Sequence, residues 1–149
     1  MKKLILLVPL FALFACDVQV EHEPEVTYLN MPGMAELDLP FSSAVRVGST
    51  LYLSGNIGNI PGTINLAEGG ISGETRQTMD NISRVLEEFG STIDDVVKCS
   101  VFLADMSEWG AMNEVYKTYF KNPPARSALG ASGLALNARV EIECIAVTK

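Results

Sequence analysis

The sequence predicts an α+β fold, with two α-helices packed on one face of a single mixed β-sheet. Apolar residues recur at three- and four-residue spacing over 74–89 and again over 107–120, which is typical of amphipathic helices. Apolar residues alternate with a period of two over 44–54 and 139–147, which is typical of strands. The elements follow in the order strand, strand, helix, strand, helix, strand, strand. Because each helix has one apolar face, both can cover the same side of one sheet.

Residues 44–54 are predicted to form a β-hairpin. Val45 and Val47 alternate with Arg46, and the pattern resumes after Gly48-Ser49. Glycine adopts a positive φ at low steric cost, so Gly48 favours the turn there. The next segment, 55–70, holds five glycines and one proline and is predicted to be a long surface loop. It contains no phosphate-binding loop and no GxGxxG motif, so we expect no nucleotide site.

The first helix is predicted over 74–89, with Ser72 or Thr75 capping its start and Gly90 following its end. Its apolar stripe consists of Met79, Ile82, Leu86 and Phe89. A long, largely buried strand is then expected over 94–105.

The second helix is predicted over 107–120, and the pair Asp105 and Glu108 before it has the spacing of a capping box. Asn113 lies off the apolar stripe and is available for a hydrogen bond. Pro123 and Pro124 end this region, and two further strands follow. The predicted inward stripe, interpreted as core and not as a cofactor site, is Trp109, Met112, Tyr116 and Tyr119.

One face of the last strand carries two carboxylates, Glu141 and Glu143, beside the apolar Ile145 and Val147. A face exposed only to water would not explain the apolar pair. A subunit interface that contains a polar pocket would explain both pairs.

Residues 1–15 have the pattern of a secretory signal peptide. Lys2 and Lys3 precede twelve uncharged residues, which as a helix of ~1.5 Å per residue fall short of a ~30 Å bilayer core. The sequence "LFAC" resembles the lipobox of bacterial lipoproteins, in which the cysteine, here Cys16, is acylated. An ordinary signal peptide with an incidental cysteine is the alternative. We therefore expect export to the bacterial cell envelope or periplasm, a lipid anchor at Cys16, an acidic tether over 16–27 and one domain over 28–149.

Composition argues against several kinds of partner. The formal net charge is −7, and loss of Lys2 and Lys3 with the leader makes it −9. Nucleic acid is therefore not expected as a partner, since phosphates need clustered Lys and Arg. The single histidine, His22, lies in the tether, so neither a histidine-based metal site nor a Ser-His-Asp triad is available. Export makes a disulfide between Cys99 and Cys144 chemically possible, but we expect buried thiols.

Four places in the domain together resemble the Rid family, also called YjgF, and especially its imine deaminase branch. The similarity spans about residues 39–147. It is carried by "LPFSSAVRVGSTLYLSG", "TRQTMDNISRVLEEFGSTIDDVVKCSVFLAD", "MNEVYKTYF", and the strand pair "PPARSALG" and "RVEIECIAV". The resemblance implies a homotrimer with sites between subunits. It also implies hydrolysis of 2-imino and enamino acids such as 2-aminoacrylate to 2-oxo acids and ammonia, with no metal or organic cofactor.

The same resemblance implies a role for each residue of the matching motifs. Arg126 would hold the substrate carboxylate through two parallel charge-assisted hydrogen bonds. Glu141 would orient a water molecule and accept its proton as the water attacks the C=N carbon. The remaining substrate-binding positions are Gly55, Phe41, Asn113 and Ala128.

The chain departs from the family pattern at three places. Phe41 replaces the usual tyrosine, which removes a phenolic hydroxyl. Ala128 replaces a frequent cysteine, although its backbone N–H remains. Leu134-Ala135 replaces a Leu-Pro pair in the last turn.

Three alternatives remain open at this stage. Arg126 could be a structural ion-pair partner of Glu141 or Glu143, and Glu143 could pair with Arg139 or with a basic residue of a neighbouring subunit. At the level of function, the chain could be a non-catalytic trimer that binds a small carboxylate ligand at the cell envelope. An enzyme of another class on a similar trimeric fold, such as a chorismate mutase, is the third alternative.

Overall fold

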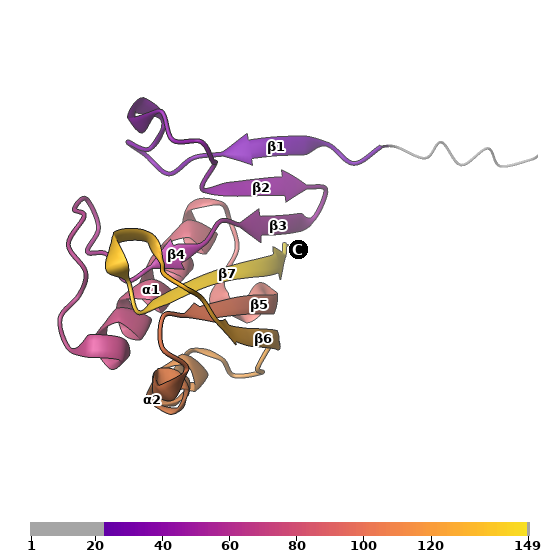
Figure 1. The fold of residues 1–149 in the computed structure, drawn as a ribbon. Helices are drawn as coiled ribbons and strands as arrows, with labels where there is room; N and C mark the ends of the chain where they lie inside the picture. Colours follow the sequence, from indigo (N-terminus) through magenta and orange to yellow (C-terminus); the bar gives the residue numbers. More distant parts are fainter. Residues whose placement is uncertain (1–22, 149) are drawn as a thin grey trace, which may run out of the picture.

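The structure, a computed structural model, describes residues 23–148 and shows one mixed β-sheet (Figure 1). The strands are β1 (Val26–Leu29), β2 (Ala44–Val47), β3 (Thr50–Leu53), β4 (Asn56–Ile57), β5 (Val96–Leu103), β6 (Ala125–Gly130) and β7 (Val140–Val147). Their order across the sheet is β1-β2-β3-β7-β5-β6, with β4 also paired to β7. β5 and β6 are parallel and the other pairs are antiparallel. The predicted signal peptide over 1–15, the predicted lipidation site Cys16 and His22 lie outside the described residues.

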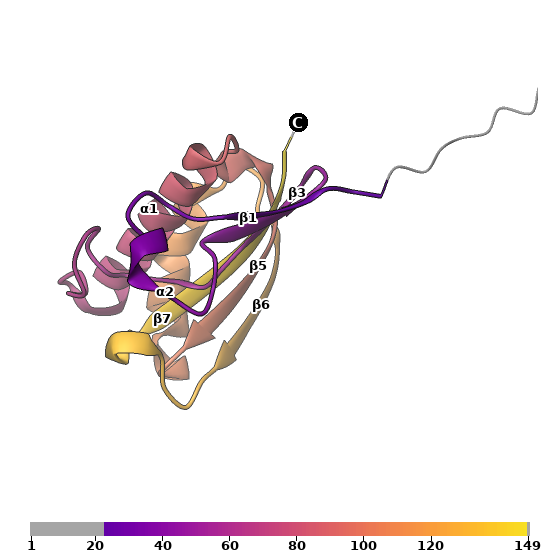
Figure 2. The ribbon, with the colours of Figure 1, turned by 90° about the horizontal axis from the view of Figure 1, so that it is seen from above.

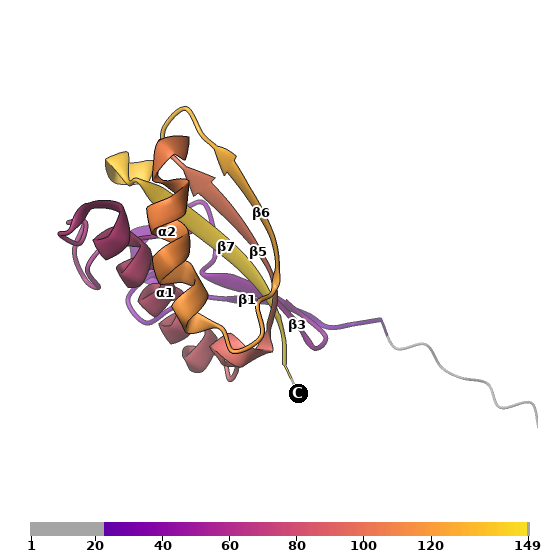
Figure 3. The same ribbon diagram turned by 90° about the horizontal axis from the view of Figure 1, so that it is seen from below.

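Both helices, α1 (Gly70–Glu88) and α2 (Trp109–Tyr116), cover the same face of the sheet (Figures 2 and 3). The core lies between them and the central strands, where Met79, Ile82 and Leu86 of α1 are fully buried against Ile142. Within residues 23–148 no helix covers the opposite face, which is called the open face below. The predicted fold class is confirmed. Among these residues no helix has the length and apolar character needed to cross a bilayer.

The predicted hairpin is confirmed as β2 and β3, with Gly48 at φ 56° in the turn. β1 was not predicted: it begins at Val26, inside the segment interpreted as a tether, and pairs with β2. β4 was not predicted either and lies within the expected loop over 55–70. Both strands are short, and only their pairing with neighbours distinguishes them from loop sequence.

The helix ends differ from the prediction in detail. α1 begins at Gly70, four residues early, and its N-cap Gly69 (φ 98°) makes no side-chain cap. Ser72 and Thr75 therefore lie inside the helix, and the Thr75 hydroxyl donates to the Ile71 carbonyl. Gly90 follows the end at φ 76°, as predicted. α2 is extended at both ends by 3-10 turns, Met106–Glu108 and Lys117–Tyr119.

Cys99 and Cys144 form a disulfide, so the expectation of two buried thiols is wrong. The two residues are directly opposite each other on β5 and β7, with Cα atoms 4.1 Å apart, and both are buried. The sequence could not show this, because it does not specify that these strands are neighbours in this register.

Candidate active site

Glu141 lies on the open face of the sheet. Its neighbours Val140 and Ile142 are fully buried beneath the helices, and successive side chains of a strand point to opposite faces. Gly55, just before β4, leaves the space that the Glu141 carboxylate occupies. A Cβ atom at Gly55 would lie 2.0 Å from Glu141 Oε1. The group that lies closest to Gly55, which was predicted to bind substrate, is therefore the Glu141 carboxylate.

The pKa of the Glu141 carboxyl is raised above its ordinary value. Burial is the larger cause, because it removes water from the charged form, and the neighbouring charge of Glu143 is the second. A carboxylate whose pKa is raised holds a proton more tightly. Glu141 is thus better suited to accept a proton from water than an ordinary exposed glutamate.

Arg126 lies on β6 and packs against α2. Its Nη1 donates to Asn113 Oδ1 over 2.5 Å, which confirms that Asn113 is available for a hydrogen bond. Its guanidinium carbon lies 4.9 Å from the centre of the Tyr116 ring and 5.8 Å from that of Trp109. Burial raises the pKa of Tyr116 to about 12 against the opposing effect of Arg126. The cation therefore lies beside two aromatic rings, a favourable arrangement for a guanidinium.

Trp109 corrects the predicted stripe of the second helix. Met112 and Tyr116 are buried as expected, but Trp109 is 44% exposed and contacts Arg126. The helical spacing of apolar residues predicted that Trp109 belongs to the core. That spacing is the same whether the ring is buried or lies against a cation at the surface.

Arg126 and Glu141 are not brought together within one chain. Arg126 is paired in register with Cys99, whose side chain points toward the helices, whereas Glu141 points to the open face. Phe102 of β5 is paired with Glu141 of β7 on one side and with Leu129 of β6 on the other, so Leu129 and not Arg126 is in register with Glu141. The two functional groups are thus on opposite faces and roughly 10 Å apart along the strand direction. No ion pair joins Arg126 to Glu141 or Glu143 in the described part of the chain.

Phe41 and Gly55 line a cavity of about 220 Å³. Phe41 is 53% exposed at its rim. Ala128 lies two residues beyond Arg126 on the same strand and packs against the edge of the core. The predicted residues therefore form two groups, one near Arg126 and the other around Gly55.

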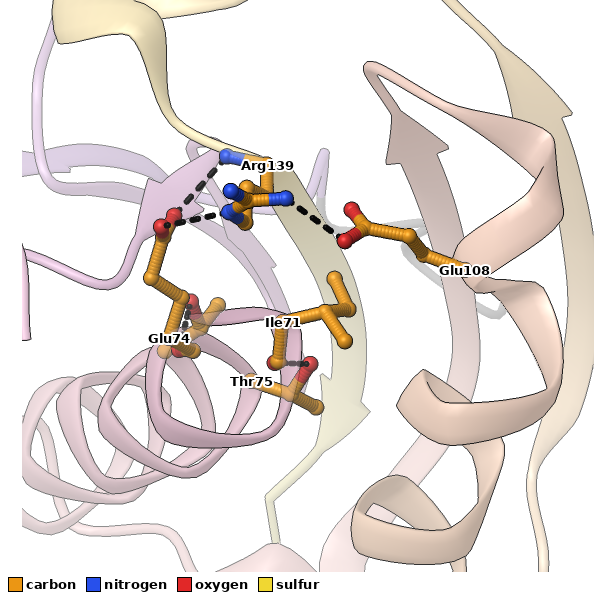
Figure 4. Close-up of polar contacts among 6 residues, drawn as sticks. Ile71, Glu74, Thr75, Glu108 and Arg139 are labelled. Atoms are coloured by element: carbon orange, nitrogen blue, oxygen red, sulfur yellow. Dashed lines mark hydrogen bonds and ion pairs between the residues drawn. The ribbon is translucent and has the colours of Figure 1, made fainter. Parts of the chain in front are cut away.

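Arg139 has a different partner from the one considered from the sequence. It does not pair with Glu143 but with Glu74 and Glu108 (Figure 4). Its backbone N–H donates to Glu74 Oε2 over 2.8 Å, and its Nη1 lies 2.6 Å from Glu108 Oε1. Glu74 is only 5% exposed. This network ties α1 and the turn before α2 to the residue that precedes β7, and so helps to fix the strand that carries Glu141.

Within residues 23–148, no group of three or more His, Cys, Asp or Glu side chains is arranged to hold a metal ion. Sequence reasoning missed Arg84, which also lines the cavity beside Gly55. In the sequence, Arg84 lies off the apolar stripe of the helix, as other charged residues of that helix do, so nothing marked it as a binding residue.

Residues 35–148 match the family model described as endoribonuclease L-PSP. The chain is 44% identical over 109 residues to the 2-iminobutanoate/2-iminopropanoate deaminase of Mus musculus, covering 72% of this chain and 81% of that protein. The protein of the same name from Homo sapiens is 41% identical over 109 residues, covering 72% of this chain and 80% of that one.

The fold of this chain is also similar to solved structures. RidA from an Antarctic Psychrobacter superposes with a TM-score of 0.70 at 38% identity, covering 74% of this chain and 89% of that one. Yeast Mmf1 superposes with a TM-score of 0.74 at 35% identity, covering 84% of this chain and all of the yeast chain.

Proposed function

This chain belongs to the Rid (YjgF) family, whose model is described as endoribonuclease L-PSP, and from that membership we propose that it is an imine deaminase. The reaction is hydrolysis of a 2-imino acid, or of the enamine in equilibrium with it, of the 2-iminopropanoate type. Water adds to the C=N carbon, the C–N bond then breaks, and the products are a 2-oxo acid and ammonia. The single observation that carries the proposal is the identity of 41–44% to proteins named for this activity.

In this proposal Arg126 binds the substrate and Glu141 transfers a proton. Arg126, already fixed by Asn113 and two rings, holds the substrate carboxylate, and each charge-assisted bond of this kind contributes roughly 1.5–3 kcal/mol when shielded from water. Glu141 orients the attacking water and takes its proton, a role that typically contributes ~10²–10⁴-fold. Its raised pKa supports this assignment.

We further propose that the active unit is a homotrimer in which Arg126 of one chain meets Glu141 of the next. Two observations support it. Within one chain these groups are on opposite faces of the sheet, so one chain alone cannot direct both at a small substrate. The open face also exposes apolar side chains, Tyr52 (46%) and Val147 (42%) among them, beside the Glu143 carboxylate. Burial of such a face between subunits is favourable.

The test generates 2-iminopropanoate or 2-iminobutanoate in situ and follows the imine that semicarbazide can trap. Wild-type protein should accelerate the loss of trappable imine, and Arg126→Ala should not. Equal activity of the two proteins would contradict the assignment. A carboxylate that binds at Arg126 without turnover of any imine would instead identify a binding protein, the alternative favoured by the missing hydroxyl at Phe41.

RNA is a poor fit as substrate, although the family description names an endoribonuclease. The formal net charge of −7 opposes approach of a polyanion. Incubation with single-stranded RNA at low salt is the direct check, and cleavage there would overturn this exclusion.

We also propose that the enzyme works outside the cytoplasm as a lipoprotein anchored through Cys16. Support comes from the signal-like residues 1–15 and from the Cys99–Cys144 disulfide, because disulfides persist mainly in oxidising compartments. Labelled palmitate should enter the wild-type protein, and Cys16→Ala should be unlabelled and released from the membrane fraction. Recovery of unlabelled wild type in the cytoplasm would contradict the proposal.

A further inference from the structure

We infer that the cavity beside Gly55 is a side-chain subsite for 2-imino acids whose side chain ends in a carboxylate, with Arg84 as its cation. The inference rests on the proposed deaminase function and names a substrate class for it.

The cavity is adjacent to the proposed reaction centre. Gly55 contacts the Glu141 carboxylate and also lines the cavity, so the two spaces share this residue. The volume of about 220 Å³ is several times the ~30 Å³ that one water molecule occupies in the liquid. A side chain of several heavy atoms therefore has room in the cavity, and Gly55 is the residue at which the cavity borders the Glu141 carboxylate.

The walls of the cavity suit a short methylene chain. They come from the segment after β1, the start of β4 and the surface of α1. Met31, Met34 and Val85 supply apolar surface, and Phe41 stands at the rim. Contact of CH₂ groups with such side chains is favourable because it removes apolar surface from water.

The asparagine amides that line the cavity already donate to backbone carbonyls, Asn81 with both of its hydrogens and Asn56 and Asn59 with one each. Asn81 Nδ2 donates to the carbonyls of Ile57 and Asn59. Asn59 Nδ2 donates to Thr63 O and Asn56 Nδ2 to Ser54 O. A ligand therefore finds few free donors among these side chains.

Arg84 is different, because it forms no hydrogen bond or ion pair with any group of residues 23–148. Asp80, one turn before it on α1, accepts a hydrogen bond from Tyr119 instead. A guanidinium presents a planar fork that matches a carboxylate, and an unpaired one at the mouth of a cavity favours an anionic group there. The substrate class that fits both the walls and the cation is the imine of a dicarboxylic amino acid.

The experiment compares kcat/KM for 2-iminoglutarate, generated in situ by a glutamate oxidase, with kcat/KM for 2-iminopropanoate. Arg84→Gln should lower kcat/KM for 2-iminoglutarate by about five- to tenfold. The expected effect is smaller than that of losing a buried hydrogen bond to a charged group, because Arg84 is exposed and water screens its charge. It should leave 2-iminopropanoate unchanged. Arg76→Gln is the matched control, an exposed arginine of the same helix outside the cavity, and should change neither substrate.

A parallel arm measures binding of the reaction product 2-oxoglutarate by calorimetry, so that the subsite is tested apart from catalysis. If Arg84→Gln lowers turnover of both imines equally, or of neither, the subsite is overturned and the deaminase function stands. If wild type hydrolyses no imine, the deaminase function fails. In that case the subsite is still supported if wild type binds 2-oxoglutarate and Arg84→Gln does not. The subsite is overturned if wild type does not bind 2-oxoglutarate, or if Arg84→Gln binds it equally well.

Discussion

The guanidinium of Arg126 and the carboxylate of Glu141 lie on opposite faces of the same β-sheet. The arginine is directed toward α2 and the glutamate toward the open face. If both act on one substrate molecule, they must come from different copies of the chain. The arrangement of a single subunit therefore makes a strong prediction about the assembly.

Two inactive variants should restore each other's activity when mixed. Arg126→Ala and Glu141→Gln should each be inactive alone. After co-refolding in equal amounts, about one quarter of the sites in a random cyclic trimer would join an intact Arg126 to an intact Glu141. Imine trapping should then show about 25% of wild-type activity.

The control mixes the same two variants after separate folding, where activity should stay at the background level until subunits exchange. Absence of recovery after co-refolding, with trimers confirmed by light scattering, would show that both residues act within one chain or that one of them is not catalytic.

Gly55→Ala should lower activity strongly without unfolding the protein. The new Cβ would lie 2.0 Å from Glu141 Oε1, a separation that forces the carboxylate away. The expected result is a loss of at least tenfold in kcat, since a displaced base cannot hold the water in line. Gly133→Ala is the control, because its Cβ would have no neighbour within 4 Å. Thermal unfolding should separate a local displacement from loss of the fold.

Glu143→Gln should shift the acidic limb of the pH–rate profile to lower pH. The folded-state pKa of Glu141 is raised by burial first and by Glu143 second. Removing the second negative charge lowers that pKa, so Glu141 remains a carboxylate, and hence a base, at lower pH. The alkaline limb should not move. An unchanged acidic limb would indicate that a group other than Glu141 controls it.

The same raised pKa has a consequence for stability. The folded state binds the Glu141 proton more tightly than the unfolded chain does, so the ionised group destabilises the fold at neutral pH and this cost is relieved as pH falls through the folded pKa. Glu141→Gln should accordingly unfold at a higher temperature than wild type at pH 7 while it is inactive. Below the folded pKa the difference should shrink, which calorimetry at two pH values can measure.

Much of the fold could be predicted from local sequence. The hairpin over 44–54 follows from alternation and Gly48, and α1 follows from a stripe that is fully buried at Met79, Ile82 and Leu86. The start of α1 could not be predicted, because Gly69 caps it without a side-chain bond. β1 has only four residues, and it is stabilised as a strand by pairing with β2, a partner its own sequence does not specify.

The sequence proposed members of a site but could not predict how the fold arranges them. Motif similarity proposed Arg126 and Glu141 as candidates, and alternation within a strand shows which residues share a face. It does not show which face of one strand matches which face of another. That depends on sheet order and register, which also decide that Cys99 lies opposite Cys144. Trp109 was misplaced for a related reason, since helical spacing does not reveal a cation above a ring.

Trp109→Ala should weaken substrate binding more than it slows the chemical step. The ring lies 5.8 Å from the guanidinium carbon of Arg126 and is partly exposed. Cation–π contacts at exposed sites contribute about 0.5–1 kcal/mol, which corresponds to a rise of about two- to fivefold in KM. Trp109→Phe should retain most of the effect, and Met106→Ala, which removes another exposed apolar side chain nearby, should have none. Equal losses of kcat in both Trp109 variants would contradict a positioning role.

Reduction of the Cys99–Cys144 disulfide should lower stability substantially. The bridge joins residues separated by 45 positions, and closing a loop of that length is worth up to about 4 kcal/mol in the chain-entropy model. For a domain of this size the loss corresponds to about 10 °C or more in Tm.

Both cysteines are buried, so the protein should be unfolded with reductant, refolded and compared with an oxidised sample treated alike. A Cys16→Ala background leaves only these two cysteines to be counted, and thiol titration should find none before reduction and two after it. Cys99→Ala/Cys144→Ala should have the lower Tm with or without reductant. Two free thiols in protein purified from the cell envelope would contradict the bridge, and with it the support that it gives to export.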